Sequence, residues 1–306
     1  DITSAQVQAR PQFRVKAETG QVFVTLDAQE EDRLFVTPSL LRSEDAGDTW
    51  SATSRADLRV SVADFSTGRA TWPDDIQVLF GGGSKVSLVW TWGWEPWTWP
   101  RTVWMANSTD GGVTFGEPAP ILKTWAPVQA TSANGIMAIA YRSGTEERQA
   151  LAVATSSDNG KSWYAAAASG EVPLYFDSDH SPGLGIAPNG TIDLVFYAHD
   201  PGSVEPDSTN CLLDLGSWLE VSAMGRVDPC TYNLYYTFSK DGGVHFSDPI
   251  QLNPQPIEGE DLARFQGRTT PGSHLAVASS DGYAYPAWIA TLGAEQTELV
   301  ALQISR

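Results

Sequence analysis

The chain has 306 residues and a formal net charge of −18, with 19 Lys and Arg against 37 Asp and Glu. It has no basic stripe to neutralise phosphates, so we expect neither nucleic acid nor an anionic membrane surface as a partner. No run of about 20 apolar residues occurs, so no transmembrane segment is expected.

In chain order a repeat is visible: strand, tight turn, strand, loop, strand, polar turn, strand. The first copy begins with Gln12–Lys16, and the short turns of the five copies lie at residues 18–20, 81–83, 134–135, 188–190 and 280–282. Dipeptides such as Asn-Gly and Asp-Gly between apolar runs are typical of hairpins. The fifth copy ends at Arg306 without its last strand, which residues 2–9 are expected to supply. Residues 57–71 or 253–267 could hold a degenerate sixth copy, so five and six remain open.

The polar turn of the repeat follows the pattern S-x-D-x-G-x-(T/S/H)-(W/F) at residues 43–50, 108–115, 156–163 and 239–246. The Asp can accept hydrogen bonds from its own turn, the Gly can adopt positive φ, and the aromatic ring can pack on the sheet. These roles predict that the motif residues are structural: Asp45, Gly47, Trp50, Asp110, Gly112, Phe115, Asp158, Gly160, Trp163, Asp241, Gly243 and Phe246.

The four motifs resemble the Asp-box, or BNR repeat, of sialidases and other secreted β-propellers. The resemblance implies an all-β fold, a single β-propeller over residues 1–306. Its blades would be four-stranded and antiparallel, five or six in number, with Asp-box hairpins and the N-terminal strand closing the last blade. It also implies an exported protein, periplasmic or extracellular. In that family the boxes lie away from the catalytic site, so they predict the fold and not the activity.

In a blade of this kind, the short turns and the Asp-boxes share one end. The loops between second and third strands and the links between blades share the other, which we call the loop face. Propellers place their sites there. One long loop-face insertion, residues 198–232, contains Cys211 and Cys230. A disulfide between them would close a loop of about 20 residues and add very roughly 3 kcal/mol. We expect this disulfide, with two free buried thiols as the alternative.

A second loop-face insertion is rich in tryptophan. Trp94, Trp97 and Trp99 stand among Gly, Glu and Pro and are followed by Arg101. Three interpretations remain open: a self-packed aromatic cluster, a protein–protein contact and a sugar-stacking platform.

A third candidate is the link at residues 177–180, which contains Asp179 and His180. Its oxygen ligands suit a hard cation such as Ca²⁺, but loop solvation and turn capping explain the same residues. We therefore expect no cofactor and no bound metal.

Sialidases bind the substrate carboxylate with three Arg and use an Asp as acid/base and a Tyr–Glu pair as nucleophile. Phe13-Arg14 matches two positions of the family's Phe/Tyr-Arg-Ile-Pro motif, which makes Arg14 the candidate first Arg. The alternative is that Arg14 is an outward member of an alternating strand. By the same resemblance Arg268 is the second, Arg142 or Arg226 the third, and Asp32 the acid/base. A solvated charge run at residues 31–33 explains Asp32 equally well. No Tyr–Glu pair stands out, because Tyr197, Tyr232 and Tyr283 all fit as strand residues.

Because this catalytic signature is mostly missing, the sequence favours a noncatalytic recognition or scaffold subunit. Its loop face would dock on a partner protein or a larger complex, including a membrane-associated one. The alternative is a sialidase-like exo-glycosidase in which Arg14 and Arg268 bind a carboxylate sugar. A glycan-binding propeller of lectin type is the third hypothesis.

Overall fold

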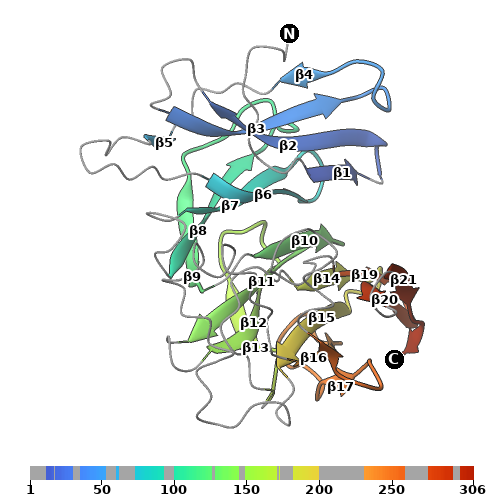
Figure 1. Ribbon diagram of the computed structural model, residues 1–306. Helices are drawn as coiled ribbons and strands as arrows, with labels where there is room; N and C mark the ends of the chain where they lie inside the picture. Colours follow the sequence, from blue (N-terminus) through green and yellow to red (C-terminus); the bar gives the residue numbers. More distant parts are fainter. Residues whose placement is uncertain are drawn as a thin grey trace, which may run out of the picture. The chain divides into compact units, whose positions relative to one another are not determined.

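The computed structural model describes residues 12–16, 18–29, 35–52, 60–61, 73–92, 100–125, 128–144, 149–170, 172, 182–199, 231–258, 275–291 and 297–306. Throughout these ranges the chain forms strands and turns and contains no helix. The strands make five antiparallel sheets, each built from strands that are consecutive in the sequence (Figure 1).

The first two sheets come from the N-terminal part of the chain. The first has the order β1 (Gln12–Lys16), β2 (Gln21–Gln29), β3 (Phe35–Ser43), β4 (Ser51–Ala52), and β5 (Val60–Ser61) also pairs with β3. The second has the order β6 (Pro73–Phe80), β7 (Val86–Trp92), β8 (Arg101–Ser108), β9 (Ala119–Thr124).

The other three sheets repeat this plan. The third is β10 (Gln129–Ala133), β11 (Ile136–Gly144), β12 (Gln149–Ser156), β13 (Tyr164–Ala167). The fourth is β14 (Gly183–Ile186), β15 (Ile192–His199), β16 (Thr231–Ser239), β17 (Ile250–Gln251), with β18 (Ile257–Glu258) also on β16. The fifth is β19 (Ala276–Ser279), β20 (Tyr283–Thr291), β21 (Thr297–Ala301), with β22 (Ile304–Ser305) also on β20.

The predicted all-β propeller class with four-stranded antiparallel blades is confirmed, and the described residues form five blades. The described parts of the two stretches that could have held a sixth blade, β5 and β18, pair with β3 and β16 instead. The predicted closing strand at residues 2–9 lies outside the described residues.

By its contacts the chain divides into two compact units. The first contains Asp1–Thr124, Ala130–Met137 and Ser156–Trp163, and the second contains Trp125–Gln129, Ala138–Thr155 and Tyr164–Arg306. The core of the first unit includes Phe23 and Leu40 of the first sheet together with Leu88 and Trp90 of the second. The second unit has two apolar clusters, one that contains Leu194 and one that contains Trp288.

Each Asp-box closes its own turn with side-chain hydrogen bonds. In the first box, Asp45 Oδ1 accepts a bond from the Thr49 N–H at 2.8 Å and Oδ2 accepts one from the Thr49 hydroxyl at 2.5 Å. Ser43 donates to Asp45 at 2.8 Å and accepts the Gly47 N–H at 2.7 Å. These bonds, led by the one from the Thr49 hydroxyl, lower the pKa of Asp45 to about 2.

The other three boxes repeat this geometry, and hydrogen bonds likewise lower the pKa of Asp110, Asp158 and Asp241. In the fourth box the second donor is an imidazole, with His245 Nδ1 2.7 Å from Asp241 Oδ2. The box carboxylates are therefore occupied by their own turns, as the structural assignment requires.

The box aromatics behave less uniformly than the motif predicts. Phe115 is buried, but Trp50 is 40% exposed. The Trp50 indole N–H donates to the Gly47 carbonyl at 2.9 Å, and the Trp163 indole N–H donates to Gly160 at 3.2 Å. A tryptophan can thus cap the turn through its N–H, whereas phenylalanine can only pack.

Candidate functional site

The described part of the candidate site lies on the first strands of three sheets: β1, β6 and β10. Arg14 on β1 extends its guanidinium to β10, where Nη2 donates to the Ala130 carbonyl at 3.3 Å. Gln77 on β6 is completely buried, and its side-chain oxygen accepts the Ala130 N–H at 2.7 Å. Two polar side chains from different sheets therefore bind both backbone groups of one residue.

The alternation of β1 explains why Arg14 is directed inward. Phe13 and Val15 are 65% and 60% exposed, whereas Arg14 is half-buried and Lys16 is buried. Lys16 donates to the Gly83 carbonyl in the turn between β6 and β7. Burial lowers the pKa of Arg14, yet a guanidinium remains charged at neutral pH. The first strand thus places two cations on the face that meets the neighbouring sheets.

First strands have one unpaired edge, whose N–H and C=O groups need partners. Side chains of adjacent sheets supply some of them: the Thr25 hydroxyl donates to the Ile76 carbonyl at 2.8 Å, and the Ser132 hydroxyl accepts the Phe80 N–H at 2.6 Å. The bonds of Arg14 and Gln77 belong to the same system. One role of the Arg14 side chain is therefore structural, because it satisfies the Ala130 carbonyl on this edge.

A β-bulge lies at the loop-face end of β6. Asp74 is opposite Thr91 and Gln77 is opposite Val89, so two residues of β6 face one residue of β7. Bulges bend a strand and redirect side chains, and they are frequent beside active sites. The bulge falls directly before Gln77.

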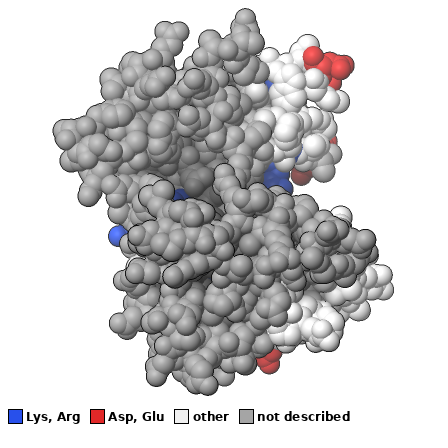
Figure 2. Space-filling view, in the orientation of Figure 1, with Lys and Arg blue, Asp and Glu red and all other residues white. Residues whose placement is uncertain are grey.

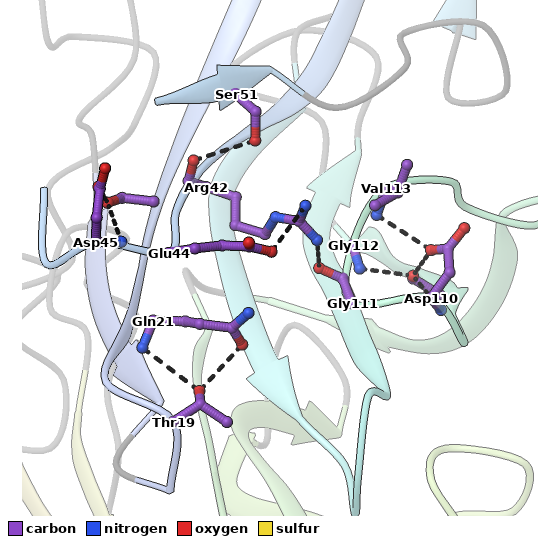
Figure 3. A network of polar contacts seen from close by, with 12 residues as sticks. Thr19, Gln21, Arg42, Glu44, Asp45, Ser51, Asp110, Gly111, Gly112 and Val113 are labelled. Carbon is purple, nitrogen blue, oxygen red and sulfur yellow. Dashed lines mark hydrogen bonds and ion pairs between the residues drawn. The ribbon is translucent and has the colours of Figure 1, made fainter. Parts of the chain in front are cut away.

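Arg42 illustrates a contrasting, purely structural arginine in the same unit (Figure 3). Its Nη1 donates to the Gly111 carbonyl of the second Asp-box at 3.1 Å, and its Nη2 lies 3.1 Å from Glu44 Oε1. This network lies at the Asp-box end of β3 and not at the loop face.

Arg101, a predicted binding residue, is the first residue of β8 and is opposite Thr124 of β9. It is half-buried on the third strand of its sheet, whereas Gln77 is on the first. The other candidates lie outside the described residues and remain predictions: Asp32, Trp94, Trp97, Trp99, Asp179, His180, Arg226, Arg268, Cys211 and Cys230.

Three tyrosines of the second unit, Tyr141, Tyr197 and Tyr232, are buried. Tyr197 and Tyr232 pack with Trp288 in an apolar cluster, and burial raises the pKa of Tyr197. Burial also raises the pKa of Tyr141, which precedes the buried Arg142 on β11. A phenol whose ionisation is suppressed is not an activated nucleophile, so neither Tyr197 nor Tyr141 is placed in a catalytic role.

One buried polar cluster was missed by the sequence reasoning. Asp193 on β15 is completely buried and contacts Tyr236 and Arg306. The sequence signal for this cluster was Asp193 itself, a carboxylate inside the apolar run from Ile192 to Phe196, because a buried charge needs a partner.

Over the described ranges, no group of three or more His, Cys, Asp or Glu is arranged to hold a metal ion. None of the described segments is a helix long and apolar enough to cross a membrane. On the face drawn in Figure 2, the described acidic and basic side chains are dispersed and form no extended patch of either sign.

A family model described as BNR repeat-like domain matches residues 15–295. The chain belongs to the BNR repeat-like family. No curated protein sequence matches it.

Several solved structures share the fold of this BNR repeat-like chain. An α-L-arabinofuranosidase of Fusarium graminearum, bound to an iminosugar inhibitor, is 13% identical with a TM-score of 0.51; the match covers 98% of this chain and 93% of that one. An α-L-arabinanase of Penicillium chrysogenum with arabinobiose is 15% identical with a TM-score of 0.51, over 94% and 78% of the two chains. An intramolecular trans-sialidase of Ruminococcus gnavus is 10% identical with a TM-score of 0.51, over 98% and 85%.

These similarities overturn the expectation of a noncatalytic scaffold. The similar structures are glycosidases of more than one specificity, arabinan-directed as well as sialic-acid-directed. The error lay in treating a missing sialidase motif as missing catalysis, because one fold carries different catalytic residue sets.

Proposed function

We propose that the chain is a glycoside hydrolase that removes an acidic sugar from the end of a glycan. The observation that carries the proposal is Arg14, a partly buried guanidinium on a first strand of the propeller fold, beside Gln77 and the β6 bulge. It is supported by membership of the BNR repeat-like family and by similar structures that are glycosidases.

The chemistry of Arg14 suits a sugar carboxylate. A guanidinium has five N–H donors in a planar fork. Among the described residues, Arg14 donates to the Ala130 carbonyl through Nη2. Partial burial strengthens a charge-assisted pair relative to the same pair in water. The fixed bond to Ala130 also orients the fork, so less entropy is lost when a carboxylate binds.

Hydrolysis also requires an acid/base and a group or water that attacks the anomeric carbon. We assign the acid/base to Asp32, in the segment that follows β2 of the same sheet as Arg14, and a second carboxylate contact to Arg268. The tryptophans at positions 94, 97 and 99 would then stack on sugar rings. The proposal includes export to the periplasm or the extracellular space, where a Cys211–Cys230 disulfide would form.

A second candidate is an enzyme for neutral L-arabinofuranosyl residues. It is favoured by the arabinofuranosidase match, which covers nearly the whole of both chains. Such a substrate has no carboxylate, so Arg14 would then serve only the Ala130 contact.

The test is turnover of 4-methylumbelliferyl glycosides of N-acetylneuraminic acid, glucuronic acid and L-arabinofuranose by wild type, Arg14→Ala, Arg14→Lys and Arg42→Ala. Loss of one partner of a buried charge pair costs about 2–5 kcal/mol, or at least about thirtyfold in kcat/KM. We expect this loss of kcat/KM on an acidic glycoside in Arg14→Ala. Arg14→Lys should show most of the same loss, because Lys cannot bind a carboxylate bidentately. The Arg42 variant is the matched control and keeps wild-type turnover.

Each outcome is informative. Turnover of the arabinofuranoside alone, unaffected by Arg14→Ala, would refute the acidic-sugar assignment and support the second candidate. A folded wild-type protein that hydrolyses none of the three, nor an arabinan or a sialylated glycan, would refute glycoside hydrolysis.

A further inference from the structure

The fourth and fifth sheets, both within the second compact unit, approach each other very closely. At Gly185 of β14, an added Cβ would lie 2.9 Å from the Val277 carbonyl oxygen and 2.4 Å from the Ser279 hydroxyl, both on β19. At Gly183 it would lie 3.1 Å from backbone atoms of Ala276. Only glycine allows this approach, so the two first strands are packed backbone to backbone.

Next to this contact lies the buried cluster centred on Asp193. Asp193 is 0% exposed, and its Oδ1 accepts a hydrogen bond from the Tyr236 hydroxyl at 2.7 Å. Its Oδ2 lies 3.3 Å from Nη2 of Arg306, whose side chain is 2% exposed. Arg306 Nε and Nη1 are buried and have no hydrogen-bond partner among the described residues. The Asp193 carboxylate and the carbonyls that accept from Nη2 therefore stabilise this buried cation.

Arg306 is itself anchored in the fifth sheet. Its Nη2 donates to the carbonyls of Ser280 and Tyr283, the latter at 2.5 Å, and its backbone N–H donates to Gly282 at 3.2 Å. Ser280 and Gly282 lie in the turn between β19 and β20, and Tyr283 is the first residue of β20. A further bond joins the equivalent turn of the fourth sheet, since the Asn189 side-chain amide donates to the Asp281 carbonyl at 2.9 Å.

We propose that Arg306 and Asp193 form a buried ionic latch that fastens the turn between β19 and β20 to the fourth sheet. The latch joins residues 113 positions apart (306 minus 193) and is independent of the proposed enzymatic function. Exposed ion pairs contribute little, but a buried cation or carboxylate that loses its partner is strongly unfavourable. The attachment of this turn to the fourth sheet should therefore weaken most when one of the two charges is buried without the other.

The groups that face Asp193 define its response to pH. In the described residues these are Arg306, which follows β22, Tyr236 from β16 and Ser279 from β19. Burial raises the pKa of Asp193, while Ser279, Tyr236 and Arg306 oppose that rise. A carboxyl group whose pKa is raised in the fold lowers stability as pH rises from its unfolded pKa of about 4 up to the folded value, and the loss is complete above the folded value. Removal of Arg306 raises the pKa further, so the penalty must grow between acidic and neutral pH.

The experiment compares wild type, Arg306→Met, Asp193→Asn and the double variant by thermal unfolding from pH 4 to pH 7.5. We expect Arg306→Met to lower Tm by about 5–15 °C at neutral pH and by much less at pH 4. The double variant should recover most of the loss and show no pH dependence of the difference. Hydrogen exchange of Arg306→Met should accelerate in β19–β22 and stay unchanged in β1–β4.

Arg306→Lys keeps the charge and provides a fallback if Arg306→Met fails to fold; it should show a smaller loss of the same sign. Arg42→Met, which breaks the more exposed Arg42–Glu44 pair, is the control and should show no acid-to-neutral trend. Additive effects of the two latch substitutions, or a loss in Arg306→Met that is equal at pH 4 and pH 7.5, would overturn the latch.

Discussion

The Asp-box glycines differ in what surrounds them, and this difference gives a quantitative prediction. Gly47 and Gly243 both have positive φ, 107° and 93°. Among the described residues, an added Cβ at Gly47 would meet only the Trp50 ring at 3.7 Å, which is ordinary contact. At Gly243 it would lie 2.5 Å from Thr155 Cγ2 and 3.3 Å from Ile192 Cδ1, both buried. The fourth box thus packs closely against the third sheet, whereas Gly47 has no such close contact within the part of the chain that the structure describes.

We therefore expect Gly47→Ala to lower the free energy of unfolding by about 1–2 kcal/mol, through backbone strain alone. Gly243→Ala adds overpacking of about 1–3 kcal/mol, for a total of about 2–5 kcal/mol. The free energy of unfolding of both variants would be measured in urea against wild type, with Gly20→Ala as a further control because Gly20 has positive φ and open space around it. Equal losses at Gly47 and Gly243 would show that the boxes act only within their own turns and do not pack sheet on sheet.

Two further predictions concern the polar groups. Gln77→Leu leaves the buried Ala130 N–H without its 2.7 Å acceptor, so the free energy of unfolding measured in urea should fall by about 1–3 kcal/mol. An unchanged urea midpoint would show that another acceptor replaces the bond. The pKa of Asp45 is lowered to about 2, so the stability it contributes is present above its unfolded pKa of about 4 and is lost as pH falls through 2. Acid unfolding followed by circular dichroism should show a smaller decline with pH in Asp45→Asn than in wild type, and identical declines would contradict this linkage.

The fold could be predicted because its signals are local. The box at residues 43–50 contains every donor and acceptor that closes its own turn, so eight consecutive residues determine that geometry. The hairpin turns behave in the same way, for example at Asn134 and Gly135, which both have positive φ. The blade count could not be decided because β5 and β18 are two-residue strands, too short to leave a periodic signal.

The site could be predicted only as a list of residue types. Arg14 was identified as a candidate, but its bond to Ala130 joins positions 116 residues apart and depends on how two sheets pack. The same is true of Asp193 and Arg306, where nothing near either residue indicates its partner. The expectation of a noncatalytic role failed for a different reason. It compared the chain with one catalytic motif, whereas the propeller fold is shared by glycosidases with several specificities.

The most direct test of glycoside hydrolysis is proton NMR of the wild-type protein incubated with a sialylated oligosaccharide and with arabinobiose. The account predicts new anomeric signals of a released acidic sugar from the first substrate, with the remaining glycan shortened by one terminal residue. Both substrates intact after prolonged incubation with folded protein would contradict it.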